Sequence, residues 1–225
     1  MLPADRLARL ARLADARLYF VCEARPPAAP LEVLLAAALR GGVDVFQLRE
    51  KKLPDEDVLA AAAIARELCA EAGALFIVND RPDLAVDADA DGVHVGQDDM
   101  GVDAARAVVG RERLVGLSTH SPAQIAAAGD ADMIGVGPIY ATPTKLWRPA
   151  VGLELIAHAN EHAKQPFFAI GGIDEARAAE VAAAGAGRIA AVRAIAGSRD
   201  PEAAARALRA TVEPVALNEV VRGPA

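Results

Sequence analysis

The chain has 225 residues, of which 53% are hydrophobic and 24% are charged, a composition too apolar for a disordered chain. Its formal net charge of −7 argues against general binding to nucleic acid or to an anionic membrane, because both require a basic protein face. Cys22 and Cys69 have no metal-binding or redox spacing, and no apolar run reaches the roughly 18–20 residues of a membrane span. We therefore expect a reduced, cytoplasmic protein whose partners are small molecules, with a homo-oligomer left open.

The first segment, residues 1–16, alternates leucine and arginine, with its leucines at near-helical spacing. An arginine-rich amphipathic start is also typical of transit peptides, but Asp5, Asp15 and the lack of serine argue against that alternative. The segment predicts a short helix that packs under the main fold.

After this helix, short β-branched or aromatic runs alternate with Ala- and Leu-rich segments of helical period. Leu31–Arg40 carries one apolar stripe, and Glu56–Ala72 is a helix that we expect to end at Gly73. Ser121 and Pro122 are the predicted N-cap and first residue of a later helix. The predicted strands are Arg17–Cys22, Val43–Leu48, Leu75–Asn79, Gly92–Val95, Arg113–Leu117, Met133–Val136, Phe167–Ile170 and Arg188–Val192.

Eight alternating strands and helices predict a parallel sheet with right-handed crossovers. At this chain length they favour an α/β fold that is a single (β/α)8 TIM barrel over an open doubly wound sheet. The loop after the first strand also lacks the Gly-x-Gly-x-x-Gly pattern of dinucleotide-binding sheets. We expect one domain over 1–225, with a helix in 1–16, the barrel in 17–213 and a C-terminal extension in 214–225.

Polar side chains gather where the second predicted strand ends. Because side chains alternate along a strand, Gln47, Arg49 and Lys51 share one face, while Leu48 and Glu50 lie on the other. The first face is predicted to point into the barrel mouth, and buried cations there are costly unless an anion meets them. The alternative is a structural ion pair of these cations with Glu50 or Asp80.

Carboxylates follow the third and fourth strands. Asp80 and Asp99 come from neighbouring strand ends beside the inferred anion site, where two carboxylates and substrate phosphates suit Mg²⁺. The alternative is that both residues are helix N-caps, a common role of aspartate. We expect Asp98 to serve as a cap only.

The last three strands lead into loops suited to a second anion. The sixth is followed by a hydroxyl-rich loop that ends at Lys145, the seventh by Gly171-Gly172, and the eighth by Arg193. Loops after strands seven and eight are the usual phosphate site of this fold. An ordinary tight turn is the alternative for the two glycines. Together with Arg49 and Lys51, these cations predict a rim that binds two phosphorylated groups.

These segments occur in a familiar order between Arg17 and Val212, and the ordered set resembles the signatures of thiamine phosphate synthases. They are Gln47-Leu48-Arg49-Glu50-Lys51, Asn79-Asp80-Arg81, Asp91-Gly92-Val93-His94-Val95-Gly96-Gln97-Asp98-Asp99, Gly137-Pro138-Ile139-Tyr140, Thr142-Pro143-Thr144-Lys145 and Ala169-Ile170-Gly171-Gly172-Ile173.

The resemblance implies a transferase that joins an aminopyrimidine diphosphate to a thiazole phosphate with Mg²⁺. It implies dissociative loss of pyrophosphate and capture of a pyrimidinylmethyl cation by the thiazole nitrogen, with Arg49, Lys51 and Lys145 catalytic and Asp80 and Asp99 holding the metal. The implied substrate-binding residues are Gln47, Leu48, Arg49, Glu50, Lys51, Asn79, Ser118, Thr142, Pro143, Thr144, Lys145, Gly172, Val192 and Arg193.

The chain departs from the family pattern at Arg193, where many members have serine. Because arginine can grip a phosphate with two parallel hydrogen bonds, we expect a rebuilt thiazole-phosphate site. Trp147 in the unusual segment 146–150 is interpreted as a lid residue, with a surface anchor as the alternative.

The histidines give weaker signals. His94 is predicted to be a packed, hydrogen-bonded residue, and His120 to lie near substrate. His158 and His162 are expected on a solvated helix face. Two rival functions remain: a barrel that tautomerises the thiazole phosphate, and a non-catalytic sensor of thiazole or thiamine phosphate.

Overall fold

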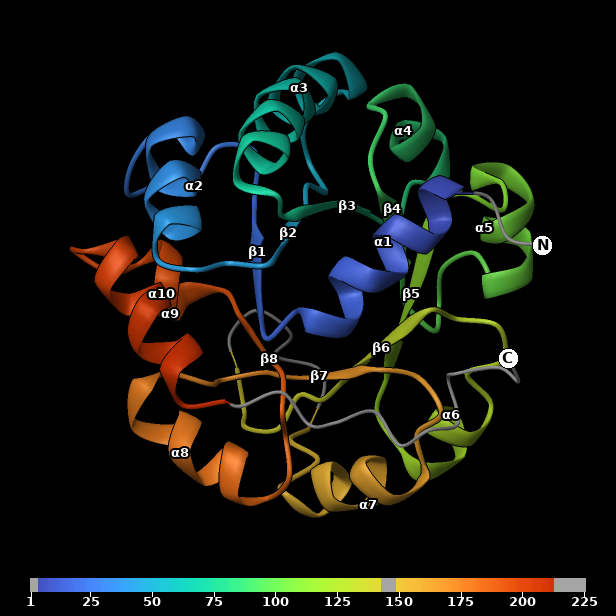
Figure 1. Ribbon diagram of the computed structural model, residues 1–225, viewed down its shortest axis with the longest axis vertical. Coiled ribbons are helices and arrows are strands. Elements are labelled where there is room, and N and C mark those ends of the chain that lie inside the picture. The colour runs from blue at the N-terminus through green and yellow to red at the C-terminus, as the bar shows by residue number, and fades with distance from the viewer. Residues whose placement is uncertain (1–3, 143–148, 213–225) are drawn as a thin grey trace.

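The computed structural model describes residues 4–142 and 149–212. Eight parallel strands close into a barrel in sequence order, with β1 hydrogen-bonded to both β2 and β8 (Figure 1). The α/β class and the single closed TIM barrel predicted from the sequence are therefore confirmed. The strands are β1 Leu18–Cys22, β2 Val45–Leu48, β3 Leu75–Asn79, β4 Gly92–Val95, β5 Leu114–Thr119, β6 Met133–Val136, β7 Phe167–Ile170 and β8 Ile189–Ala191.

Helices surround the barrel and alternate with its strands (Figure 1). None of those in the described ranges is both long and apolar enough to cross a membrane. They are α1 Ala4–Asp15, α2 Leu31–Arg40, α3 Asp55–Ala72, α4 Pro82–Asp87, α5 Val102–Val109, α6 Pro122–Ala126, α7 Glu154–His162, α8 Glu175–Ala183, α9 Arg193–Ala196 and α10 Pro201–Ala210.

Several predicted boundaries shift by one or two residues. Val43 was predicted to begin the second strand, but its N–H bonds to the Ala38 carbonyl and completes the turn after α2 instead. The fifth strand runs on to Thr119, because Thr119 still pairs with Val136 of β6. The expected caps are confirmed: Ser121 accepts a hydrogen bond from the Gln124 N–H, and Gly73 ends α3 with a φ of 71°.

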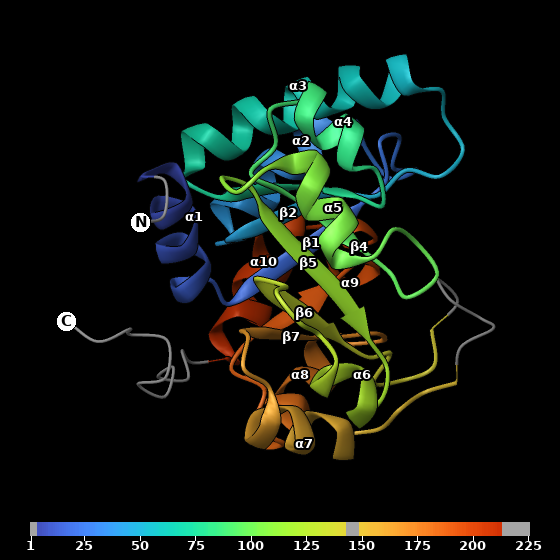
Figure 2. The same ribbon diagram turned by 90° about the vertical axis from the view of Figure 1, so that its right-hand side faces the viewer.

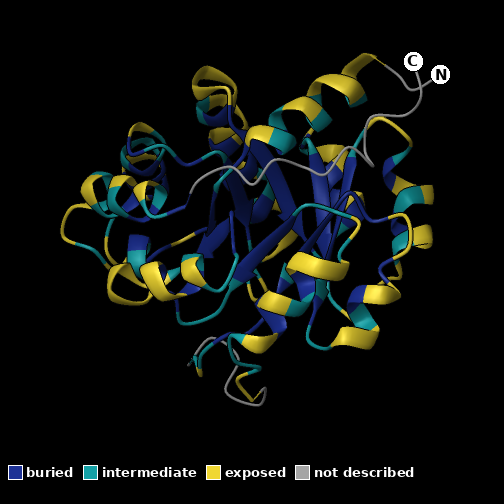
Figure 3. Cartoon of the chain, turned by 60° about the horizontal axis from the view of Figure 1, so that its bottom comes forward, coloured by how far each residue is buried: buried dark blue, intermediate teal, exposed yellow. Residues whose placement is uncertain are grey.

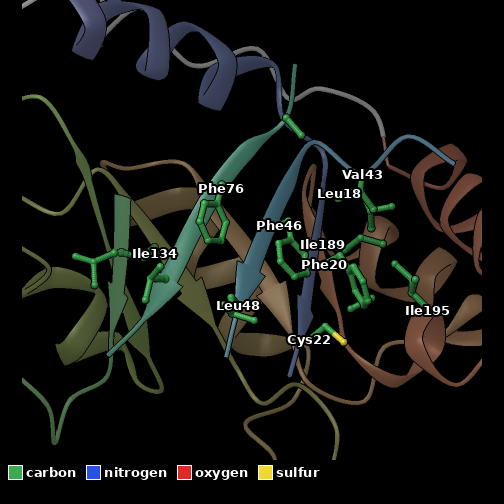
Figure 4. Packing of buried hydrophobic residues seen from close by; sticks show 14 of the residues in the cluster. Leu18, Phe20, Cys22, Val43, Phe46, Leu48, Phe76, Ile134, Ile189 and Ile195 are labelled. Carbon is green, nitrogen blue, oxygen red and sulfur yellow. The ribbon is translucent and has the colours of Figure 1, made fainter. Parts of the chain in front are cut away.

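The alternation of side chains along the strands divides the core into two layers. Phe20, Phe46 and Phe76 point outward and pack between the strands and the helices (Figure 4). Tyr19 and Phe168 point inward and fill the barrel, with their ring centroids 5.1 Å apart in an edge-to-face contact. Burying an aromatic or branched side chain stabilises the fold by about 1.5–3 kcal/mol. Figure 3 shows the result, with buried strands inside helices whose outer faces are exposed.

Helix α1 lies across the N-terminal end of the barrel, as predicted, and leaves the opposite end open to the strand-ending loops (Figure 2). Its Leu13 is buried against the inner layer. Largely buried ion pairs fix the helix to the barrel: Arg6 bonds Asp132, and Arg9 lies 2.8 Å from the Asp91 carboxylate. Asp132 is almost fully buried, and its charge is compensated by Arg106 as well as by Arg6. The closed end is therefore built for stability.

Candidate functional site

A pocket of about 340 Å³ opens at the ends of the strands, the face where TIM barrels carry their sites. Its apolar floor is formed by the inner barrel layer, including Tyr19, Met133 and Phe168. Two polar walls rise from the floor. We call them the β2–β5 wall, formed by Gln47, Arg49, Asn79, His94 and Ser118, and the β7–β8 wall, formed by Gly171, Gly172, Arg177, Val192 and Arg193.

The end of β2 places its polar side chains as the two-residue period predicts. Gln47 is buried and donates a hydrogen bond from Nε2 to the Tyr19 hydroxyl at 2.8 Å, and Arg49 lines the pocket above it. Burial raises the pKa of Tyr19 well above its usual value, so the phenol stays neutral. Leu48, which the resemblance made a substrate-binding residue, points the other way into the outer core. Its side chain does not line this pocket.

Glu50 anchors the loop after β2. Its carboxylate accepts hydrogen bonds from the backbone N–H groups of Lys51 at 2.8 Å and Lys52 at 2.9 Å, and from Ala24 at 3.4 Å. Burial alone would raise the pKa of Glu50, but the backbone N–H groups together lower it. Glu50 therefore holds the loop in shape and does not line the pocket wall.

Lys51 and Asp80 form the ion pair that the sequence left as an alternative. Lys51 Nζ lies 2.8 Å from Asp80 Oδ2, and both side chains are partly exposed. Asp80 adopts a φ of 60°, which ordinary residues seldom adopt, and its N–H bonds to the His94 carbonyl at 2.8 Å. This tie between β3 and β4 holds the carboxylate at the barrel rim.

Neither of the predicted metal ligands, Asp80 and Asp99, is the N-cap of a helix. The N-cap of α4 is Arg81 and that of α5 is Gly101, and neither makes a side-chain capping bond. The cap expected at Asp98 is therefore wrong, because α5 begins farther along the chain. Asp99 instead accepts a hydrogen bond from the Gly96 N–H at 2.9 Å, within the turn after β4.

The carboxylates of Asp80 and Asp99 follow neighbouring strands, as expected for ligands of a divalent cation. No group of three or more His, Cys, Asp or Glu side chains within residues 4–142 and 149–212 is arranged to hold a metal ion. Two carboxylates still fit Mg²⁺, which is typically held by one or two of them together with substrate phosphates and water.

Asn79 has a buried hydrogen-bond donor without an acceptor among the described residues. Its side chain is 8% exposed and lines the pocket, and its Nδ2 atom has no hydrogen-bond partner among the described residues. A buried donor left unpaired costs about 1–3 kcal/mol, so an oxygen-rich ligand that reaches it gains affinity. This buried donor is an observation independent of sequence that supports a ligand at the β2–β5 wall.

Histidines complete the same side of the pocket. His94 Nε2 lies 3.0 Å from the Ser118 hydroxyl, so His94 is the packed, hydrogen-bonded residue that the sequence predicted. His120 also lines the pocket, and its Nδ1 contacts the Gly137 carbonyl. His158 and His162 stack on α7 with ring centroids 4.3 Å apart, far along the chain from these groups.

The β7–β8 wall depends on two glycines with positive φ, 106° at Gly171 and 67° at Gly172. A Cβ atom at Gly171 would lie 2.5 Å from Pro138, so only glycine allows this close approach. Val192 and Arg193 follow β8 and line the same wall, and Thr142 lines the pocket from the loop after β6. The predicted residues Pro143, Thr144, Lys145 and Trp147 lie outside the described residues.

Two site features had no clear signal in the sequence. Tyr19 lies in an apolar run, and only the barrel closure makes its hydroxyl the partner of Gln47. Arg177 lies on α8, where a single arginine is usually a solvated side chain, yet it lines the β7–β8 wall. Both contacts arise from tertiary packing, which local pattern does not encode.

Comparison with known proteins agrees with this geometry. The family model described as thiamine monophosphate synthase matches residues 18–195. A thiamine-phosphate synthase of Thermobifida fusca is 48% identical over 203 residues, which are 88% of this chain and 93% of that protein. One from Gloeobacter violaceus is 51% identical over 84% of this chain, and this chain spans about half of its length, 55%. This chain likewise spans only part of the relative from Thermosynechococcus vestitus, 57% of its length.

Solved structures show the same fold. A thiamine phosphate pyrophosphorylase from Pyrococcus furiosus superposes with a TM-score of 0.81 and 31% identity, covering 94% of this chain and 99% of that one. A 3-hexulose-6-phosphate synthase superposes with a TM-score of 0.62 at 22% identity, covering 87% of this chain and 99% of that one, and at this identity the likeness concerns the fold alone. From the family match and the relatives that this chain spans almost completely, the chain belongs to the thiamine monophosphate synthase family.

Proposed function

We propose that this chain is a thiamine-phosphate synthase. It would join 4-amino-2-methyl-5-(diphosphooxymethyl)pyrimidine to thiazole phosphate and release pyrophosphate. The observation that carries this proposal is one pocket with guanidinium groups on two separate walls, Arg49 on the β2–β5 wall and Arg177 and Arg193 on the β7–β8 wall. Two anionic substrates match that distribution of positive charge, and Asp80 and Asp99 at the ends of β3 and β4 would allow the one at the β2–β5 wall to bind with a metal.

The β2–β5 wall is the proposed diphosphate subsite. Arg49 and Lys51 neutralise the charge that grows on the departing pyrophosphate, and Gln47 and Asn79 contribute neutral donors. The unpaired Nδ2 of Asn79 supports this assignment, because a diphosphate oxygen would satisfy it. Lys145 belongs to the same proposal through the family resemblance. Ser118, positioned by His94, would contact the pyrimidine.

Asp80 and Asp99 would hold Mg²⁺ beside this subsite. When bound, the cation supplies positive charge that neutralises the diphosphate oxygens. Lys51 must then exchange its contact with Asp80 for a contact with the diphosphate, since ammonium and metal compete for the same carboxylate. Because the Lys51 side chain is half-exposed, breaking this ion pair does not leave a buried charge without a partner.

The β7–β8 wall is the proposed thiazole-phosphate subsite. Gly172, Val192 and Arg193 line it, with Thr142 nearby, and Thr144 is assigned to it by resemblance. The apolar floor lies between the two walls, which favours exclusion of water. A dissociative reaction needs this environment more than it needs a protein nucleophile. The pyrimidinylmethyl cation would be captured by the thiazole nitrogen before water reaches it.

The test is to measure pyrophosphate released by the full chain with the two substrates separately and together, with and without Mg²⁺. We expect release with both substrates and Mg²⁺, together with an equal amount of thiamine phosphate. Conversion of the thiazole phosphate alone to a tautomer would indicate the isomerase alternative. Binding of either substrate with no turnover would indicate a sensor and would overturn the proposed function.

A further inference from the structure

Arg177 lies in the pocket although it belongs to a surface helix. It is in the first turn of α8, and its side chain lines the β7–β8 wall together with Arg193. Its Nη1 donates a hydrogen bond to the Gly172 carbonyl at 2.8 Å. Arg177 is thus bonded to the same turn whose glycines shape the wall.

The guanidinium of Arg177 is also held from its flat side. Its central carbon lies 4.6 Å from the centroid of the Tyr140 ring, a cation–π contact. Tyr140 is fixed in turn, because its hydroxyl donates to Glu180 at 2.7 Å and its N–H donates to the Gly171 carbonyl at 3.0 Å. A guanidinium held in this way loses little further side-chain entropy when it binds an anion.

The charges around Arg177 leave the wall cationic. Burial and the Glu180 carboxylate raise the pKa of Tyr140 to about 12, so the hydroxyl remains a donor and occupies Glu180. Asp174 is the acidic group of the pocket lining on this side, and its carboxylate caps α8 by accepting from the Arg177 backbone N–H at 3.1 Å. Arg177 and Arg193 therefore outnumber the carboxylates in this part of the pocket lining.

We propose that Arg177 is a second guanidinium contact for the phosphate of the thiazole substrate, and that it selects the phosphate ester over the corresponding thiazole alcohol. This inference rests on the proposed function, whose subsite it deepens. An arginine has five N–H donors, and the contact with the Gly172 carbonyl uses one of them. The others can reach a phosphate oxygen while the stack on Tyr140 keeps the plane of the guanidinium fixed.

The experiment compares Arg177→Gln and Arg177→Lys with Arg206→Gln, which removes the same charge from an exposed ion pair on α10. Steady-state kinetics are measured with the thiazole phosphate and with the thiazole alcohol. Calorimetric binding of the thiazole phosphate is measured in parallel. For Arg177→Gln we expect kcat/KM for the phosphate to fall about ten- to a hundredfold, with the value for the alcohol within about twofold. Arg177→Lys should recover part of the loss, and Arg206→Gln should match the parent chain.

The binding measurement separates this inference from the proposed function. If the parent chain binds thiazole phosphate but turns nothing over, the function is wrong, and a loss of binding confined to Arg177→Gln still supports the contact. An equal fall for the phosphate and the alcohol would overturn the inference, because Arg177 would then act only by supporting Gly172 and Tyr140. Unchanged phosphate affinity in Arg177→Gln would overturn it as well.

Discussion

Lys51 Nζ and Asp80 Oδ2 lie 2.8 Å apart, so a cation from the loop after β2 neutralises a carboxylate at the end of β3. The two residues are the proposed diphosphate-binding and metal-binding groups of adjacent strands. Their pairing keeps both charges at the rim and compensated before substrate arrives. The same ion pair could instead serve only to stabilise the fold, and substitutions distinguish this structural role from a role in binding substrate and metal.

The first prediction concerns the metal. Asp80→Ala and Asp99→Ala should each remove most Mg²⁺-dependent turnover, because each loses a ligand of a hard cation. The unfolding temperature of Asp99→Ala should stay near that of the parent chain, since Asp99 is not buried. At Asp80 the stability-matched variant is Asp80→Asn, because asparagine tolerates the φ of 60° there. Asp87→Ala, at the exposed end of α4, is the control for loss of one carboxylate. Full activity of either rim variant would remove that residue from the metal site.

The second prediction concerns the diphosphate grip. Arg49→Ala should lower kcat about ten- to a hundredfold, because one charged contact to the leaving group is worth about 1.5–3 kcal/mol. Lys145→Ala should have a similar effect. Arg206→Ala on α10 serves as the control. A collapse of the unfolding temperature of Arg49→Ala, measured by calorimetry, would show instead that Arg49 is a structural residue.

The third prediction uses the anchoring role of Glu50. Because its folded pKa lies below the usual value of 4.5, its contribution to stability is present above that value and is lost as the pH falls through the folded pKa. Glu50→Gln should therefore unfold about 2–4 °C earlier at pH 7, for a loss of about 1 kcal/mol. The difference should shrink below pH 4.5. A difference that is constant with pH would assign the effect to packing.

The fourth prediction concerns the departure at Arg193. If its guanidinium binds the thiazole phosphate, Arg193→Ser should raise the KM for that substrate and leave the KM for the pyrimidine diphosphate nearly unchanged. Arg193→Lys should restore only part of the affinity, because an ammonium cannot make a forked contact. Kinetics with each substrate varied in turn provide the measurement. An unchanged thiazole KM in Arg193→Ser would leave that phosphate to backbone N–H groups and the neighbouring side chains.

The barrel and much of its rim follow from local pattern. The two-residue period of β2 correctly separates Gln47 and Arg49 from Leu48, because closure of the barrel buries one face against helices and the other in the pocket. Strand ends are less predictable. Val43 has strand-like chemistry, yet its N–H is used by the turn after α2.

Contacts between segments distant in sequence could not be predicted. Arg81 forms a bidentate ion pair with Asp55, which lies 26 residues earlier in the chain, with 2.8 Å to each carboxylate oxygen. Arg177 is held at the pocket by its cation–π contact with Tyr140, which belongs to the loop after β6. These side-chain contacts form only when the barrel closes, so no local sequence pattern predicts them.

The central claim is that two walls of one pocket bind different anions. The most direct measurement is a crystal structure of the full chain with thiamine phosphate, pyrophosphate and Mg²⁺. We expect pyrophosphate against Gln47, Arg49 and Asn79, the metal between it and the two rim carboxylates, and the phosphate ester against Gly172 and Val192. Pyrophosphate bound at the β7–β8 wall, or both ligands bound outside the pocket, would contradict the account.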